Sequence, residues 1–502
     1  MKPHQILLML LAVFVLLLGI MLIFPEEGIK ITDNFSLQFK TYKEFFSEKE
    51  SVDITDIIED TEVTEDTIVF VEPEVLDSAY IDSVLVVYKP VPIGVDSVRQ
   101  YLEFPAGNRD LLDTIFAVLA NLKNTNDLIR ILHYGDSQIE VDRMTSYIRY
   151  KLQAAFGGSG PGFLPAEQVF GFKQPMVMSS SDNWHRYTIF PRKDSIIDHK
   201  RFGILGNFYS FTAYEPPDSL LVDSSFSVLD ESLFNKKEPQ TAWLKFENSP
   251  VAFDNVRKYT QAKMFFGYNK SDFNLKVFAN EQEISNKNIR KTDYLSVESW
   301  DFGSSPQEVS FEFSGTDSPE IYGFTFDGYR GVAVDNIPVR GSSGLFFARM
   351  DLRLMQQMYQ NLNVKLIILQ FGGNRVPYDS TNIVGYKNYF GHQIKLLQSI
   401  TNNVPIIVIG PGDMSQKVKD NYETHENLET VRNMVRLAAL ENNCAFWDMY
   451  EAMGGRNSMA SWVFHDPPLA SKDFIHFTPN GARIVAQMFY NALIYEYNSS
   501  LN

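Results

Sequence analysis

The chain contains a single cysteine, Cys444, among 502 residues. One cysteine excludes an intrachain disulfide and a zinc site built on several thiolates. Basic residues are also in the minority, since 45 Lys and Arg stand against 62 Asp and Glu, for a formal charge of −17. Nucleic acids are held mainly through Lys and Arg, so this balance argues against a nucleic-acid partner. The histidines show no metal-ligand spacing, and we expect neither a metal nor another cofactor.

Most of the acidity lies in one stretch near the N-terminus. Between Glu48 and Asp96 there are 14 acidic and two basic residues, a charge of −12, which leaves −5 for the rest of the chain. No helical period persists there, and prolines interrupt it. We therefore predict a partly disordered acidic tether over residues 25–105, extended by its own charge, in which runs at 67–71 and 84–88 could form strands or dock on the folded body.

A long apolar run precedes this tether. Ile6 to Phe24 is 19 residues without a charge, and about 20 helical residues span a hydrocarbon core roughly 30 Å thick. Lys2 precedes the run and Glu26 follows it, which favours a cytoplasmic N-terminus and export of the remainder. A cleaved signal peptide is the alternative, but no small-residue cleavage site follows. We expect a transmembrane signal-anchor over residues 6–24.

Two segments, 106–168 and 331–502, alternate short apolar runs with helical patterns. Strands that read as continuous apolar runs between helices are buried on both faces, which indicates an α/β fold with a doubly wound parallel sheet. The strand candidates are Leu128–Tyr134, Val364–Gln370, Val404–Gly410 and Ala445–Trp447. The helix candidates include Arg143–Phe156, Leu345–Leu362, Tyr386–Thr401, Leu428–Asn442 and Gly481–Tyr497.

Residues 169–330 have a different character. Short runs rich in β-branched and aromatic residues, such as Ala262–Tyr268 and Phe273–Ala279, are separated by Gly, Asn, Asp and Ser. This spacing is typical of a β-sandwich or jelly roll. We therefore predict a β-rich domain inserted into the α/β domain.

Polar residues stand where the predicted parallel strands end, the usual place for active groups on such sheets. Ser137 follows the first strand, where its hydroxyl would be exposed at a turn. His476 could take the proton of that hydroxyl, and Asp473, three residues earlier, could orient His476. The backbone N–H groups of Ser137 and Gly341 and the amide of Asn374 could surround a developing oxyanion.

These residues lie in four blocks, HYGDSQIEVDRMT, PVRGSSG, FGGN and DFIHFT. In this order they resemble the SGNH (GDSL-like) hydrolase family over about residues 106–168 and 331–502. The resemblance implies an SGNH-hydrolase-like, flavodoxin-like parallel sheet. The resemblance implies Ser137 as nucleophile, His476 as base and Asp473 as its orienting partner. It also implies an oxyanion hole formed by Ser137, Gly341 and Asn374.

A narrower resemblance is to bacterial cell-wall esterases with a β-sandwich insert, of which peptidoglycan O-acetylesterases are the best-known examples. It rests on segments such as IYGFTFDGYRGVAVDNIPVRGSSG and CAFWDMYEAMGG. It implies a carbohydrate-binding-module-like insert, an O-acylated glycan substrate, and a catalytic part held in the periplasm by the inner membrane. Gln138 stands where the broader family often has Leu, and Arg375 follows Asn374 where an acidic residue is frequent.

Several alternatives stay open on the sequence. Relatives of this kind also transfer acyl groups to glycan hydroxyls, often with a membrane O-acyltransferase as partner. A noncatalytic glycan-binding scaffold is the alternative from another class. His465-Asp466 is a rival dyad, and His133 is expected to pack rather than react. Trp184, Trp243 and Trp300 could stack on sugars, although burial in the sandwich is the commoner explanation for such residues.

Overall fold

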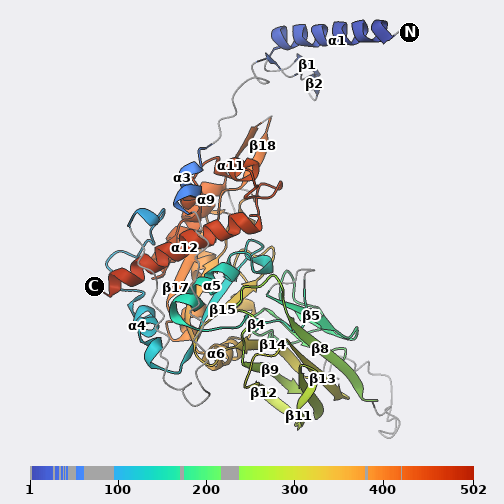
Figure 1. Ribbon diagram of the computed structural model, residues 1–502, viewed down its shortest axis with the longest axis vertical. Coiled ribbons are helices and arrows are strands. Elements are labelled where there is room, and N and C mark those ends of the chain that lie inside the picture. The colour runs from blue at the N-terminus through green and yellow to red at the C-terminus, as the bar shows by residue number, and fades with distance from the viewer. Residues whose placement is uncertain are drawn as a thin grey trace, which may run out of the picture.

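The computed structural model describes residues 3–25, 29–32, 35–37, 39, 41–42, 52–61, 95–169, 175–215, 237–378, 383–419 and 421–501. Its first helix, α1 (Pro3–Ile23), has no buried residue (Figure 1). Among the described helices, α1 is long and apolar enough to cross a membrane, a property that signal sequences share. A short hairpin of β1 (Ile29–Thr32) and β2 (Phe35–Leu37) follows it.

Two stretches of the predicted tether pack on the folded body. The helix α3 (Thr55–Asp60) buries Ile57 to 1% exposure, and Ser461 Oγ donates to the Val52 carbonyl at 2.7 Å. The turn η1 (Val95–Ser97) leads to Gln100, whose carbonyl accepts from Trp447 Nε1 at 3.0 Å. The predicted runs at 67–71 and 84–88 lie outside the described residues. The predicted tether over residues 25–105 thus contains at least two docked stretches, because each carries a few apolar side chains that the body can bury.

A five-stranded parallel sheet forms the centre of the body. Its strands are β3 (Leu128–Gly135), β15 (Gly331–Pro338), β16 (Val364–Gln370), β17 (Ile406–Ile409) and β20 (Ala445–Trp447). They lie in the order β15-β3-β16-β17-β20, and every neighbouring pair is parallel. Numbered along the chain this order is 2-1-3-4-5, which is the order of a flavodoxin-like sheet, the kind that the resemblance implied.

Helices cover both faces of this sheet. Alternate residues of β3 divide between two cores, with Ile129 and Ile131 in one and Leu132 and Tyr134 in the other. The first core includes residues of α4 (Asp113–Asn121), α5 (Thr145–Phe156) and α12 (Pro479–Ser500). The second includes residues of α6 (Leu352–Asn361), α8 (Tyr386–Thr401) and α9 (Leu428–Glu441). Figure 1 shows α12 running across the body. The apolar strand runs are explained by burial on both sides.

The helix predicted over Leu345–Leu362 is wrong in its first half. Only a single turn, η6 (Phe347–Arg349), forms there, and α6 starts afresh at Leu352. The reason is Asp351, whose carboxylate accepts the backbone N–H groups of Arg353 and Leu354 at 2.9 and 3.0 Å. Such a cap satisfies N–H groups that lack partners at a helix start, so the chain begins a new helix at this point.

The β-rich segment forms two antiparallel sheets, which Figure 1 shows at one end of the molecule. One contains β11 (Gln282–Ile289), β10 (Phe273–Ala279), β13 (Glu308–Gly315), β8 (Gln240–Asn248) and β5 (Met176–Ser180), in that order. The other contains β12 (Thr292–Asp301), β9 (Gln261–Asn269), β14 (Glu320–Asp327), β7 (Asn207–Ser210) and β6 (His185–Thr188), with β4 (Gly162–Leu164) paired to β14. Phe246 and Phe311 from the first sheet contact Phe324 from the second, with ring centroids 5.1 and 4.7 Å away. The aromatic residues therefore supply the core between the sheets.

A buried charge network joins this insert to the parallel sheet. Arg130 on β3 contacts Asp335 on β15 at 2.6 Å and Asp327 at the end of β14 at 2.5 Å. Asp335 Oδ1 also accepts the backbone N–H of Phe163 at 2.8 Å. The three charged side chains are at most 3% exposed. This pairing compensates charges that would be costly to bury alone.

Smaller elements complete the body. They are η2 (Leu122–Asn124), η3 (Glu140–Asp142), η7 (Gly373–Arg375), the hairpin of β18 (Ser415–Val418) and β19 (Asn421–Thr424), α10 (Met449–Ala452) and α11 (Ser458–Phe464).

Candidate active site

The carboxyl ends of neighbouring parallel strands bring the predicted residues to one edge of the sheet. Ser137 lies two residues after β3, and Asn374 lies in η7 just after β16. These two strands are neighbours at the point where the strand order reverses, which is where ligands bind on such sheets. Asp473 and His476 come from the loop before α12. The structure therefore gathers residues separated by more than 300 positions.

Ser137, His476 and Asp473 form a continuous chain of polar contacts. His476 Nε2 lies 2.9 Å from Ser137 Oγ, and His476 Nδ1 lies 2.7 Å from Asp473 Oδ2. Asp473 Oδ1 also accepts the backbone N–H groups of Ile475 and His476, both at 3.0 Å. This geometry allows His476 to accept the hydroxyl proton while Asp473 holds the opposite ring nitrogen.

The environment keeps Asp473 ionised. Partial burial by itself would raise the pKa of this carboxyl group. The hydrogen bonds from the His476 ring and from the backbone N–H groups of His476 and Ile475 outweigh that effect, and the pKa of Asp473 falls below its usual value. A carboxylate that accepts several hydrogen bonds is stabilised in its charged form. Asp473 is therefore available to stabilise a positively charged imidazole near neutral pH.

A cavity of about 290 Å³ opens over these groups. Ser137, His476 and Asn374 line it together with apolar side chains, among them Phe371 and Met414. A pocket that is mostly apolar with a few converging polar groups is the usual form of a site for a small reacting group.

Asn374 and Asp136 form a polar pair beside Ser137. Asn374 Nδ2 donates to Asp136 Oδ2 and to the Ser342 carbonyl, both at 3.1 Å. Asp136 Oδ1 accepts the backbone N–H of Gln138 at 3.0 Å. Burial raises the pKa of Asp136 to about 6, against the opposing effects of the Gln138 N–H, His476 and Asn374. The pair fixes the amide of Asn374 at the edge of the cavity.

Gly341 occupies the neighbouring strand end. It follows β15, whose last residue Pro338 pairs with Gly135, and it has a φ of 77° that favours glycine. Of the described residues, those lining the 290 Å³ cavity include Ser137 and Asn374 but not Gly341. The structure thus places Gly341 near this edge of the sheet, on an exposed loop.

The other candidate histidines have partners of their own outside the contacts of Ser137, His476 and Asp473. His465 Nδ1 is 2.8 Å from the Pro467 carbonyl, and its dyad partner Asp466 is exposed. His133 is fully buried between Gln370 and Thr145, 3.0 Å from each, and burial lowers its pKa to about 4. Within the described parts of the chain, no group of His, Cys, Asp or Glu could hold a metal ion.

The three candidate tryptophans differ in exposure. Trp184 and Trp300 are 8% and 6% exposed and belong to the sandwich core. Trp243 is 42% exposed on β8. Two of the three tryptophans are therefore buried in the sandwich, which is the commoner place for such residues.

Sequence reasoning did not predict the contacts that hold the Ser137 loop and the His476 loop in place. Gln138 Nε2 donates to the Ile475 carbonyl at 2.5 Å, and Arg143 Nη1 donates to the Ser137 carbonyl at 2.7 Å. Phe474 has a φ of 59°, which is rare for a bulky residue. Its ring stacks on Tyr422 of β19, with centroids 3.6 Å apart. These contacts join segments far apart along the chain, and no local pattern predicts them.

Comparison with known proteins gives a likeness in fold. No family model matches the chain, and no curated protein matches it by sequence. A solved peptidoglycan O-acetylesterase is similar at 18% identity, with a TM-score of 0.60 over 79% of this chain and 99% of that one. A family two carbohydrate esterase from Clostridium thermocellum is a weaker match, at 9% identity and a TM-score of 0.23 over 52% of this chain and 94% of that one. An acetyl xylan esterase is another, at 18% identity and a TM-score of 0.26 over 32% of this chain and 81% of that one. The first likeness establishes a shared fold.

Proposed function

We propose that the chain is a serine esterase that removes O-acyl groups, acetyl first among them, from a glycan such as peptidoglycan. The observation that carries this proposal is the line of contacts from Asp473 through His476 to Ser137, at 2.7 and 2.9 Å. The fold shared with a peptidoglycan O-acetylesterase supports the choice of substrate.

In the proposed reaction, Ser137 Oγ attacks the carbonyl carbon of the ester while His476 Nε2 takes its proton. The tetrahedral intermediate collapses, the bond to the sugar oxygen breaks, and His476 returns the proton to that oxygen. Water then attacks the acyl-serine with His476 again as base, releasing the carboxylic acid and restoring the Ser137 hydroxyl. Asp473 holds His476 in the required tautomer and stabilises its charged form.

The negative charge on the intermediate needs hydrogen-bond donors. We assign this role to the backbone N–H groups of Ser137 and Gly341 and to the Asn374 amide. Because Asn374 Nδ2 already donates to Asp136 and to the Ser342 carbonyl, one of these bonds would weaken as the oxyanion forms. Donors aimed at developing charge in a site that excludes water contribute strongly to catalysis.

We also propose that α1 anchors the protein in a membrane and that the body lies on the exported side. The length and apolar composition of α1 support this proposal. A glycan outside the cell would then be reached by a body tied to the membrane through the acidic segment.

The proposal is tested by acetate release from purified O-acetylated peptidoglycan, compared with other acetylated glycans. Wild-type protein should release acetate, and Ser137→Ala should lose the activity while keeping its fold by circular dichroism. Ser399→Ala, an exposed serine on α8, is the matched control and should retain activity. Full turnover by folded Ser137→Ala protein would refute the assignment. Formation of acetylated acceptor in place of free acetate would instead indicate acyl transfer.

A further inference from the structure

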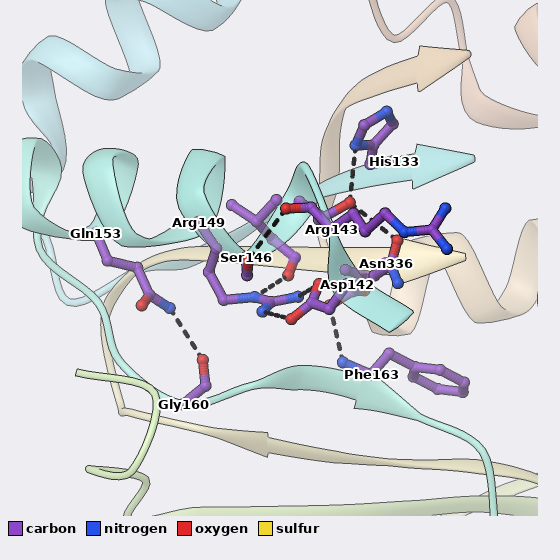
Figure 2. Close-up of polar contacts among 12 residues, drawn as sticks. His133, Asp142, Arg143, Ser146, Arg149, Gln153, Gly160, Phe163 and Asn336 are labelled. Carbon is purple, nitrogen blue, oxygen red and sulfur yellow. Dashed lines mark hydrogen bonds and ion pairs between the residues drawn. The ribbon is translucent and has the colours of Figure 1, made fainter. Parts of the chain in front are cut away.

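A second cavity, of about 350 Å³, lies where the insert meets the parallel sheet. Val141, Asn336 and Arg340 line it from the body, and Phe163 and Asn207 from the strands of the antiparallel sheet. This volume falls in the range of roughly 300–1,000 Å³ that is usual for small-ligand sites. Figure 2 shows Asn336 and Phe163 beside the ion pair of Asp142 and Arg149 at this junction.

The segment that carries the nucleophile forms part of both cavities. Ser137 and Gln138 line the 290 Å³ cavity, and Val141 and Asp142 line the second one. Val141 and Asp142 have φ values of 57° and 64°, an unfavourable conformation that persists only where the surroundings hold it. Arg149 supplies that restraint, with its guanidinium nitrogens 2.6 and 3.1 Å from the Asp142 carboxylate. A ligand could therefore contact the second cavity while its ester lies at Ser137.

The polar groups of the second cavity suit an acetamido group. Asn336 Oδ1 accepts from Thr145 Oγ1 at 2.9 Å, and Asn336 Nδ2 makes no hydrogen bond to the described residues. Asn207 is 5% exposed, and its buried Oδ1 accepts no hydrogen bond from the residues that the structure describes. An acetamido group offers one carbonyl acceptor and one N–H donor, the complement of these two amides. Its methyl group would find apolar surface on Phe163 and Leu205.

We propose that this junction cavity binds an N-acetylated amino sugar of the same glycan whose ester reaches Ser137. The inference rests on the proposed function for its choice of glycan. It makes the junction between the two domains, and not the open face of the sandwich, the place where the insert recognises substrate. Asn336 and Asn207 are then binding residues that contact the acetamido group.

The test uses the full chain in detergent and a ligand without any ester, tri-N-acetylchitotriose. Cellotriose is the matched probe, because it has the same linkage but no acetamido groups. Saturation-transfer NMR should show the strongest transfer to the acetamido methyl protons, and calorimetry should show chitotriose binding at least tenfold more tightly than cellotriose. Equal binding of the two sugars, or no binding of either, would overturn the proposal.

Three variants locate the site. Asn336→Asp keeps the acceptor for Thr145 but loses the amide donor, and should weaken chitotriose binding at least fivefold. Met178→Trp narrows the same cavity without altering either amide, and should weaken binding as well. Asn286→Asp, an exposed amide on β11, is the control and should bind as wild type. Wild-type affinity in both cavity variants would refute this location.

Failure of this proposal is distinguishable from failure of the proposed function. Chitotriose carries no ester, so its binding does not depend on Ser137 chemistry. Selective binding without any acetate release would leave the cavity assigned and the esterase refuted. Acetate release that depends on Ser137, with no preference for chitotriose over cellotriose, would leave the esterase assigned and the cavity proposal refuted.

Discussion

Replacing Asp473 with asparagine tests whether this carboxylate orients His476. In the structure Asp473 Oδ2 faces His476 Nδ1 at 2.7 Å, while Oδ1 accepts two backbone N–H groups. The asparagine oxygen would keep the two backbone bonds, which directs its NH₂ group toward His476 Nδ1. That nitrogen must then act as an acceptor, so the ring proton moves to Nε2, and Nε2 can no longer take the proton of Ser137.

The wrong tautomer costs a rate factor of ~10³–10⁴, which corresponds to about 4–5.5 kcal/mol of transition-state stabilisation. The effect on folding should be small by comparison. Asp473 is 47% exposed, and exposed ion pairs contribute about 0–1 kcal/mol to stability. We therefore expect the unfolding free energy of Asp473→Asn to stay within about 1 kcal/mol of wild type while its turnover falls by three to four orders of magnitude.

The assay is acetate release at saturating substrate, with urea unfolding followed in parallel. Asp466→Asn is the matched control, since Asp466 is an exposed aspartate beside His465 in the rival dyad. It should leave turnover within twofold of wild type. A loss below tenfold in Asp473→Asn, or an equal loss in Asp466→Asn, would refute the assigned role. The double variant Ser137→Ala with Asp473→Asn should be no slower than Ser137→Ala alone, because the residues act as one unit.

Three further predictions concern residues outside the triad. Arg130→Met leaves buried carboxylates unpaired and should lower the free energy of unfolding by about 3–5 kcal/mol in urea titrations. Burial already raises the pKa of Asp335, and loss of Arg130 should raise it further. A carboxyl group whose pKa is higher in the folded protein than in the unfolded chain makes the folded protein less stable as the pH rises through that interval. The loss of unfolding free energy in Arg130→Met should therefore be larger at pH 8 than at pH 5. Tyr422→Ala removes the ring stacked on Phe474 and should lower kcat about tenfold with little change in KM, whereas Tyr422→Phe should retain activity. Ile57→Asp should release residues 52–61 from the body, seen as faster hydrogen exchange in α3, with turnover within twofold of wild type.

Each of these predictions has a clear contrary result. A pH-independent stability deficit in Arg130→Met would refute the account of its carboxylate partners. Equal losses in Tyr422→Ala and Tyr422→Phe would point to the hydroxyl group and not the stacked ring. Unchanged exchange in Ile57→Asp would show that burial of Ile57 does not hold α3 on the body.

Much of the parallel sheet could be predicted from the sequence because of where its strands lie. A strand covered by helices on both faces must be apolar along its length, so Val364–Gln370 stands out as a run. The edge strand β15 was missed for the converse reason, since it contains Asp335 and Asn336. Those polar residues are paired through Arg130 on β3, the Phe163 backbone N–H on β4 and Thr145 on α5. Partners distant along the chain leave no local pattern.

The candidate site likewise has features that the sequence predicts and contacts that it does not. The sequence by itself determined which residues stand at strand ends, because a strand and the turn after it occupy consecutive positions. Ser137 and Asn374 could therefore be named in advance, and the Asp473-His476 pair could be named from its spacing just before the last helix. Only the tertiary structure decided that His476 Nε2 lies 2.9 Å from Ser137 Oγ, 339 positions away. Only the tertiary structure also decided that two stretches of the predicted tether pack on the body and that a cavity forms beside the insert. Each of these depends on packing between segments distant along the chain, and such contacts arise only when the whole chain has folded.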